Sequence, residues 1–220
     1  MNAPAPAGVT EEAVEVSRGG VTLRGSLFVP RGARGPVPVV VMIAGSGPTD
    51  RDGNSSLGLR SDAYRLLAEA LAERQIATLR FDKRGVGESS AAFDVARLTI
   101  DDLVADVGAL LPKVQDRTRF SKLTVLGHSE GGLVALLLAK AARADAIVLV
   151  ASAGRPLRSV LRGQLASKVD AATLAEVDRL LADISAGRPV ERVPSGLETI
   201  FNPAIAAYLR SEIDLDPVPL

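Results

Sequence analysis

Several residue types are scarce or missing in this sequence of 220 residues. It contains no cysteine and no tryptophan, aromatic residues make up only 3%, and His128 is its single histidine. Without cysteine, the chain can form neither disulfides nor thiolate metal sites. With so few aromatic side chains, the hydrophobic core must consist mainly of Val, Leu, Ile and Ala. The single histidine leaves one imidazole for acid–base chemistry.

An excess of charge, a membrane-length apolar run and a targeting signal are also missing. The 26 basic and 26 acidic residues cancel, so nothing indicates a nucleic-acid partner. No run approaches the about 18 apolar residues of a membrane helix. The Ala/Pro-rich residues 1–8 lack the basic and apolar regions of a signal peptide. We therefore expect a cytoplasmic protein with no membrane partner, long enough for one α/β domain.

Short apolar runs indicate the strands of a sheet. Alternating residues at 13–16 and 21–29, separated by turn residues, predict an antiparallel hairpin at a sheet edge. The uninterrupted apolar run 37–43 is typical of a buried, central parallel strand, and further strands are predicted at 76–81, 123–126 and 146–150.

Helical patterns separate these strands. They cover residues 64–71, with Ser61 or Asp62 as the N-cap, and 132–142. A third begins near Thr99, where Asp102 is a candidate capping partner three residues later, and Pro112 should kink or end it. The alternation predicts right-handed crossovers and a doubly wound, mostly parallel α/β sheet.

The pattern changes after Ala151, where amphipathic helices follow one another without a strand. They are expected over 157–165, over 174–184 with Gly187 ending the helix, and from Asn202 onwards. The predicted organisation is a disordered head (1–11), an α/β core (12–152), a helical lid or cap (153–213) and the approach to a further strand (214–220).

The sequence Gly127-His128-Ser129-Glu130-Gly131 connects a predicted strand to a predicted helix. A G-x-S-x-G motif in this position is typical of a nucleophile elbow, in which a serine occupies a tight, strained turn. Gly127 and Gly131 are required because a Cβ at either position would strike nearby backbone. We therefore expect Ser129 to be a catalytic nucleophile. The alternative is an ordinary tight turn.

A serine that attacks an acyl carbonyl needs two hydrogen-bond donors for the oxyanion that forms. We expect one to be the backbone N–H of Glu130, the residue after the nucleophile. The second is expected from the loop after the strand 37–43, where Ser46 stands between two glycines. The alternative for this loop is a glycine turn with no ligand.

Two other motifs resemble ligand-binding loops but lack features that those loops require. Asp50-x-Asp52-x-Asn54 suggests calcium, but serines stand where an EF-hand needs its glycine and its bidentate glutamate. The stretch 85–90 loosely resembles a dinucleotide fingerprint, but it does not follow the first strand and no helix starts at once. We expect a structural turn carrying Asp82 and Arg84. No metal and no cofactor is predicted.

The single histidine is not expected to act as the base. Neighbouring side chains in an elbow diverge, so His128 should pack or form a hydrogen bond beside the pocket. The carboxylate of Glu130 should likewise be local structure. Four basic residues on the predicted lid could meet an acidic substrate, although solvated helix faces explain them equally well: Arg155, Arg158, Arg162 and Lys168.

Three segments together resemble the α/β-hydrolase superfamily, above all its bacterial esterase and serine-aminopeptidase-like branch. They are A-G-S-G-P-T-D-R-D-G-N at 44–54, F-D-K-R-G-V-G-E-S at 81–89 and G-H-S-E-G-G at 127–132. The resemblance implies the first six strands of that fold followed by a helical lid. It also implies a Ser-His-Asp mechanism in which Ser129 attacks an acyl carbonyl and a histidine takes its proton.

The sequence departs from that pattern after the lid. In such proteins the acid follows a seventh strand and the histidine an eighth, and neither strand is recognisable here. We therefore expect the chain to be C-terminally truncated relative to that fold. Its sixth strand (146–150) should then be an edge strand with unpaired backbone groups.

Three interpretations remain open. The first is a serine hydrolase acting on small carboxylic ester substrates through Ser129, with the triad's His and Asp absent from this chain. The second is one half of a split enzyme, completed by a second chain or segment that supplies the missing strands. The third is a non-catalytic remnant that binds ligands or serves as a scaffold.

Overall fold

A mixed sheet of six strands, in the order β1-β2-β4-β3-β5-β6, forms the centre of the computed structural model, which describes residues 6–89, 94–142 and 144–220. The strands are β1 (Val9–Arg18), β2 (Val21–Pro30), β3 (Val37–Ile43), β4 (Ala77–Phe81), β5 (Phe120–His128) and β6 (Ala146–Val150). β2 is antiparallel to β1 and β4, whereas β3, β4, β5 and β6 are mutually parallel. The predicted hairpin and the doubly wound, mostly parallel sheet are confirmed.

The chain divides into two compact units. The first combines residues 1–93 and 104–152, and the second combines residues 94–103 and 153–220. Residues 94–103, which the sequence assigned to the core, thus join the helical unit. β1 begins at Val9, so residues 9–11 belong to the sheet and not to a disordered head, because they pair with β2. The beginning of that predicted head, 1–5, lies outside the described residues.

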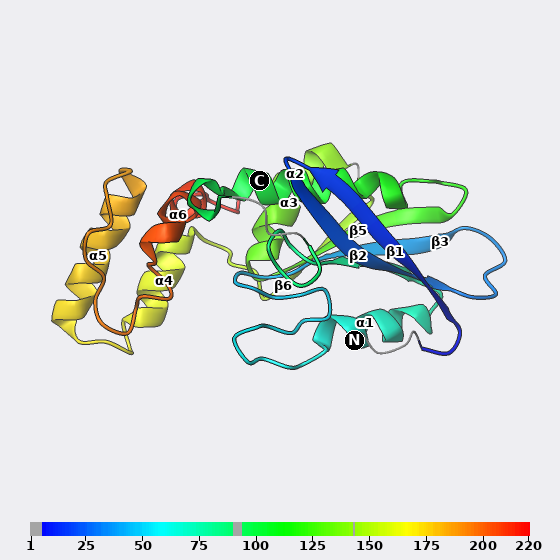
Figure 1. Ribbon diagram of the computed structural model, residues 1–220, viewed down its shortest axis with the longest axis horizontal. Coiled ribbons are helices and arrows are strands. Elements are labelled where there is room, and N and C mark those ends of the chain that lie inside the picture. Colours follow the sequence, from blue (N-terminus) through cyan, green and yellow to red (C-terminus); the bar gives the residue numbers. More distant parts are fainter. Residues whose placement is uncertain (1–5, 90–93, 143) are drawn as a thin grey trace. The chain divides into compact units, whose positions relative to one another are not determined.

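Helices cover both faces of the sheet in the first unit. Figure 1 shows α1 (Ala63–Ala72) on one face and α3 (Glu130–Ala142) on the other. Right-handed crossovers require this arrangement, because α1 leads from β3 towards one edge and α3 leads from β5 towards the other. Side chains alternate along β3, so Val40 and Met42 join a hydrophobic cluster with α1.

The helix α2 (Ile100–Leu110) begins and ends as its sequence predicts. The Asp102 carboxylate accepts hydrogen bonds from both Thr99 N–H (3.1 Å) and Thr99 Oγ (3.0 Å). Pro112 lies in the 3₁₀ turn η2 (Leu111–Val114), which ends the helix. A further 3₁₀ turn, η1 (Val95–Arg97), precedes α2.

The second unit is helical, with no strand among residues 153–220, all of which are described. It contains α4 (Leu157–Leu165), α5 (Ala171–Ser185), the 3₁₀ turn η3 (Pro203–Ile205) and α6 (Ala206–Glu212). Its core is built around Phe201 and Ile213, which are both fully buried. Gly187 adopts a φ of 70° after α5 and ends that helix as expected. Residues 214–220 form turns and coil.

β6 is an edge strand with an unusually exposed apolar surface. It pairs with β5 on one side, and no other described residue pairs with it. Val148, Leu149 and Val150 are 42%, 46% and 41% exposed. Such an edge offers unpaired N–H and C=O groups to any further strand.

Among the described helices, none is both long enough and apolar enough to cross a bilayer.

Candidate active site

Ser129 occupies the turn between β5 and α3, in a backbone conformation that side chains rarely adopt. Its φ is +54°, in the left-handed region that costs a non-glycine residue on the order of 1–3 kcal/mol. Two hydrogen bonds hold the turn: Ser129 N–H donates to Val150 O (2.9 Å), and Gly132 N–H donates to Ser129 O (3.0 Å). Strain of this kind persists where the surrounding structure enforces it, as in a nucleophile elbow.

The two elbow glycines lie against backbone, as the sequence predicts. A Cβ at Gly127 would lie 2.2 Å from Gly131 O, and a Cβ at Gly131 would lie 2.4 Å from Ile43 O. Neither contact can be relieved by a side-chain movement. The serine turn therefore packs directly on the end of β3.

A third glycine brings the loop after β3 to the serine. A Cβ at Gly45 would lie 3.1 Å from Ser129 Cβ and 3.3 Å from His128 Nδ1. β3 and β5 are neighbouring parallel strands, and the helices that follow them cover opposite faces of the sheet. Ligands of open α/β sheets bind at such a switch point, beyond the carboxyl ends of the strands. Ser129 and the loop 44–47 share this position.

The expected oxyanion donors, Ser46 and Glu130, flank this point. Ser46 follows Gly45 in an exposed loop, and among the described residues its N–H has no hydrogen-bond acceptor. Glu130 is the first residue of α3, so its N–H lies at the positive end of the helix dipole. Both N–H groups thus belong to segments that adjoin Ser129.

His128 forms a hydrogen bond beside the elbow and is not directed at Ser129 as a base. Its Nδ1 lies 2.8 Å from the Oη of Tyr64, which is the second residue of α1. Gly45 N–H donates to the same phenol oxygen (3.5 Å), so Tyr64 Oη joins the loop after β3 to His128. The Nδ1 atom of His128 is therefore engaged by a partner other than Ser129. Burial raises the pKa of Tyr64, with the Gly45 hydrogen bond opposing the shift.

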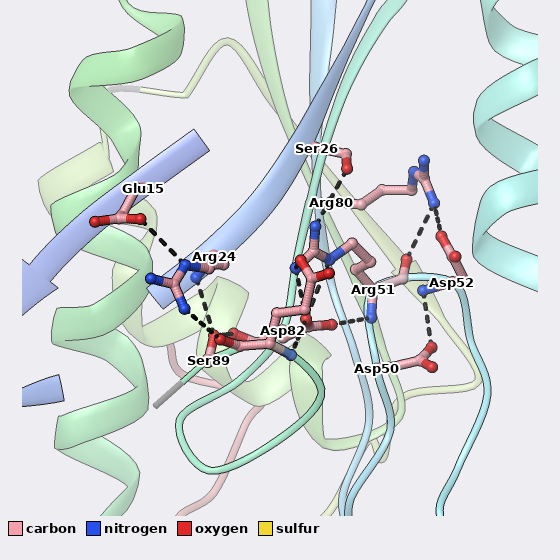
Figure 2. Close-up of polar contacts among 10 residues, drawn as sticks. Glu15, Arg24, Ser26, Asp50, Arg51, Asp52, Arg80, Asp82 and Ser89 are labelled. Carbon is pink, nitrogen blue, oxygen red and sulfur yellow. Dashed lines mark hydrogen bonds and ion pairs between the residues drawn. The ribbon is translucent and has the colours of Figure 1, made fainter. Parts of the chain in front are cut away.

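A buried charged network fixes the loop that carries Gly45 and Ser46. Both carboxylate oxygens of Asp82 accept hydrogen bonds from Arg51: Oδ1 from its N–H (2.8 Å), and Oδ2 from Nε (3.1 Å) and Nη2 (2.7 Å). Figure 2 shows Arg51 between Asp82 and Ser26, whose Oγ lies 3.3 Å from Nη1. Glu88 completes the network through its N–H to Asp82 (2.9 Å) and its carboxylate to Arg51 (2.8 Å).

The acidic loop 50–54 turns its side chains towards protein partners. Asp52 pairs with the buried Arg80, and Asp50 Oδ1 accepts the N–H groups of Asp52 and Asn54 (both 2.9 Å). Burial raises the pKa of Asp52 and lowers the pKa of Arg80, and in each case the partner's charge opposes the shift. Arg80 also lies 4.4 Å above the Phe28 ring. No described group of three or more acidic or histidine side chains could hold a metal.

The stretch 85–89 forms consecutive turns, and the residue at 90 lies outside the described residues. A Cβ at Gly87, whose φ is 53°, would lie 2.4 Å from Asp82 Oδ2. Arg84 binds Asp106 through two hydrogen bonds of 2.7 and 2.5 Å. The prediction of a structural turn carrying Asp82 and Arg84 is confirmed.

Two of the four basic residues in the helical unit are engaged in ion pairs. Arg158 lies 2.9 Å from Asp214, and Arg162 lies 2.8 Å from Asp178. These pairs agree with solvated helix faces better than with an anion site.

Sequence reasoning missed two residues that hold the loop beside Ser129. Besides Tyr64, the buried Lys83 donates a hydrogen bond from Nζ to Gly45 O. Lys83 lies inside the F-D-K-R-G-V-G-E-S segment, which was the only available signal. Its contact depends on the neighbouring positions of β3 and β4 in the sheet.

Comparisons with known proteins identify a family. Residues 57–195 match the family described as serine aminopeptidase, S33. The chain is 33% identical over 144 residues to esterase EstD of Thermotoga maritima, covering 65% of this chain and 33% of that protein. It is 35% identical over 115 residues to the putative carbamate hydrolase RutD of Variovorax paradoxus, covering 50% of this chain and 41% of that protein. The chain thus spans less than half the length of these curated relatives.

Solved structures show the same fold. The α/β hydrolase GrgF from Penicillium sp. sh18 covers 96% of this chain and 75% of its own, with a TM-score of 0.57 and 19% identity. The match to XC6422 from Xanthomonas campestris, a serine hydrolase without a lid, covers 70% of this chain and 65% of that protein, with a TM-score of 0.50 and 23% identity. The match over residues 57–195 shows that the chain belongs to the serine aminopeptidase S33 family of α/β hydrolases.

Proposed function

We propose that this chain carries the nucleophile and the oxyanion loop of a hydrolase that cleaves small carboxylic esters. The observation that carries the proposal is Ser129, held at a φ of +54° beyond the carboxyl end of β5 and packed against Gly45. The relative named esterase EstD supports an ester as the substrate class.

In the proposed reaction, Ser129 Oγ attacks the acyl carbon and loses its proton to a base. The negative charge that develops on the carbonyl oxygen is stabilised by the N–H groups of Ser46 and Glu130. The intermediate then collapses, the alcohol leaves with the proton, and an acyl-serine remains. Water attacks this acyl-serine by the same route, releasing the acid and restoring Ser129.

The base is the part of this mechanism that these 220 residues do not supply. His128 is the single histidine, and its Nδ1 is engaged by Tyr64 Oη (2.8 Å). We propose that a further segment or a second chain contributes the histidine and its acid. The unpaired, apolar edge of β6 supports this, because an added strand would satisfy its backbone groups.

The test is p-nitrophenyl acetate hydrolysis by the 220-residue chain, with imidazole titrated in as an external base. The rate of the Ser129→Ala variant is subtracted at each concentration. Ser121→Ala is the matched control, since Ser121 lies exposed at the start of the same strand. Imidazole should raise the Ser129-dependent rate by about 10-fold, part of the roughly 10²–10⁴ that a positioned base contributes.

Two results would count against the proposal in different ways. Equal rates for wild type and Ser129→Ala at every imidazole concentration would favour a non-catalytic binding protein. Fast Ser129-dependent turnover without imidazole would show that the base lies within these 220 residues.

A further inference from the structure

Gly45, the residue that packs on Ser129, is held by one partner on each side. Its N–H donates to Tyr64 Oη (3.5 Å), and its carbonyl oxygen accepts a hydrogen bond from Lys83 Nζ. Lys83 is only 8% exposed, although it follows β4 at the rim of the sheet. Burying an ammonium group is costly unless its charge is used in a specific interaction. The mechanism above leaves this lysine without a role.

The orientation of one peptide links Lys83 to the oxyanion site. Gly45 C=O and Ser46 N–H belong to the same planar peptide unit, which is trans, so they point in opposite directions. A lysine that holds the carbonyl on one side therefore turns the N–H to the other side. Among the described residues, Ser46 N–H has no acceptor and is available to a ligand.

The charge on Lys83 should also change the strength of this donor. A cation bound to a peptide oxygen draws electron density from the C–N unit and makes the N–H more acidic. Linked hydrogen bonds polarise one another in this way, and ionised donors form the stronger ones. A neutral donor at the same place would orient the peptide but polarise it less.

We propose that Lys83 is a positioning residue that orients and polarises Ser46 N–H as an oxyanion donor. This inference rests on the proposed function, since it assigns a partner to one donor of that site. In this role Lys83 acts through the Gly45 peptide.

The first test needs no turnover. The amide signal of Ser46 is recorded by ¹⁵N–¹H NMR in wild type, Lys83→Met and Lys83→Arg, with Lys122→Met as the control on the exposed part of β5. Lys83→Met removes donor and charge, so the Ser46 ¹⁵N and ¹H signals should move upfield. Lys83→Arg keeps both and should remain near wild type, as should Lys122→Met.

The second test uses the imidazole-assisted hydrolysis of p-nitrophenyl acetate. Lys83→Met should lower the Ser129-dependent kcat by about 10-fold with little change in KM, which is less than the roughly 10²–10³ that complete loss of an oxyanion donor costs. Lys83→Arg should recover most of it. Because arginine is not deprotonated in proteins, this recovery would exclude Lys83 as a base.

The two tests distinguish a failure of the role proposed for Lys83 from a failure of the function proposed for Ser129. An unmoved Ser46 signal in Lys83→Met, or equal shifts in Lys83→Met and Lys83→Arg, would overturn the role of Lys83 even if Ser129 is active. Hydrolysis that does not depend on Ser129 would overturn the proposed function, while the NMR result still decides whether Lys83 controls the peptide. If Lys83→Met does not fold, Lys83→Gln takes its place, and its Ser46 signal must lie upfield of wild type.

Discussion

At the scale of single residues, the serine turn requires glycine where neighbouring backbone atoms leave no space for a Cβ. A Cβ at Gly127 would meet Gly131 O at 2.2 Å, whereas a Cβ at Gly108, within α2, would meet only Leu138 Cδ1 at 3.8 Å. The same substitution, glycine to alanine, should therefore have opposite effects at these two positions.

Gly127→Ala should lower the free energy of unfolding by about 2 kcal/mol or more, because overpacking against backbone cannot be relieved. Gly108→Ala should raise it by about 0.5–1 kcal/mol, since alanine loses less conformational entropy in a helix. Urea unfolding followed by circular dichroism measures both. A Gly127→Ala variant as stable as wild type would contradict the packing described for the elbow.

Asp82 is the charged residue on which the loop before α1 most depends. Asp82→Asn keeps the size of the side chain but leaves the buried guanidinium of Arg51 without its main counter-charge. Breaking a buried pair in this way costs about 3–5 kcal/mol, so the free energy of unfolding should fall by that amount.

The matched control for Asp82 is Glu12→Gln, which removes an exposed pair with Arg119 (2.6 Å). An exposed pair contributes at most about 1 kcal/mol. The two variants can be compared in the same urea titration. Equal losses of stability in both would argue against a special role for the buried network.

At the scale of elements, sequence reasoning succeeded where the apolar run and the strand coincide. β3 and β6 begin and end as predicted, because turn residues bound both runs. β5 begins three residues earlier than its apolar run, at Phe120, since Val37 pairs with Phe120 across the sheet. Pairing between distant segments extends a strand through polar residues that its own sequence would assign to a loop.

Contacts between loops could not be predicted in the same way. The motif at 127–131 identified the serine turn because glycine and serine spacing is local. Tyr64 and Lys83 approach Gly45 from other segments, 19 and 38 residues away in the chain. Their roles depend on strand order and side-chain packing, which spacing alone does not encode.

The exposed edge strand β6 should affect how the chain associates in solution. Its apolar side chains and unpaired edge should promote strand pairing between copies of this chain at high concentration. Val148→Lys should reduce that association, because a lysine on an edge strand opposes pairing. Sedimentation velocity over a range of concentrations measures it.

Val218→Lys provides the control for β6. Val218 is 76% exposed but lies in no strand, so the same change of charge should leave the association unaltered. An equal decrease in both variants would attribute the association to net charge and not to the edge of the sheet.

At the scale of the whole chain, the two units have different relations to function. The sheet unit carries every residue assigned to the site: Ser46, Gly127, Ser129, Glu130 and Gly131. The helical unit has a core of its own around Phe201 and Ile213. This chain covers 33% of the length of esterase EstD.

The position of a covalent adduct tests most directly whether Ser129 is the nucleophile of a hydrolase site. The chain is treated with a fluorophosphonate, with and without imidazole, digested and analysed by mass spectrometry. We expect one adduct, on Ser129, that increases with imidazole, disappears in Ser129→Ala and persists in Ser121→Ala. Labelling of other serines at the same rate, or no labelling of Ser129 at any imidazole concentration, would show that Ser129 is not an activated nucleophile.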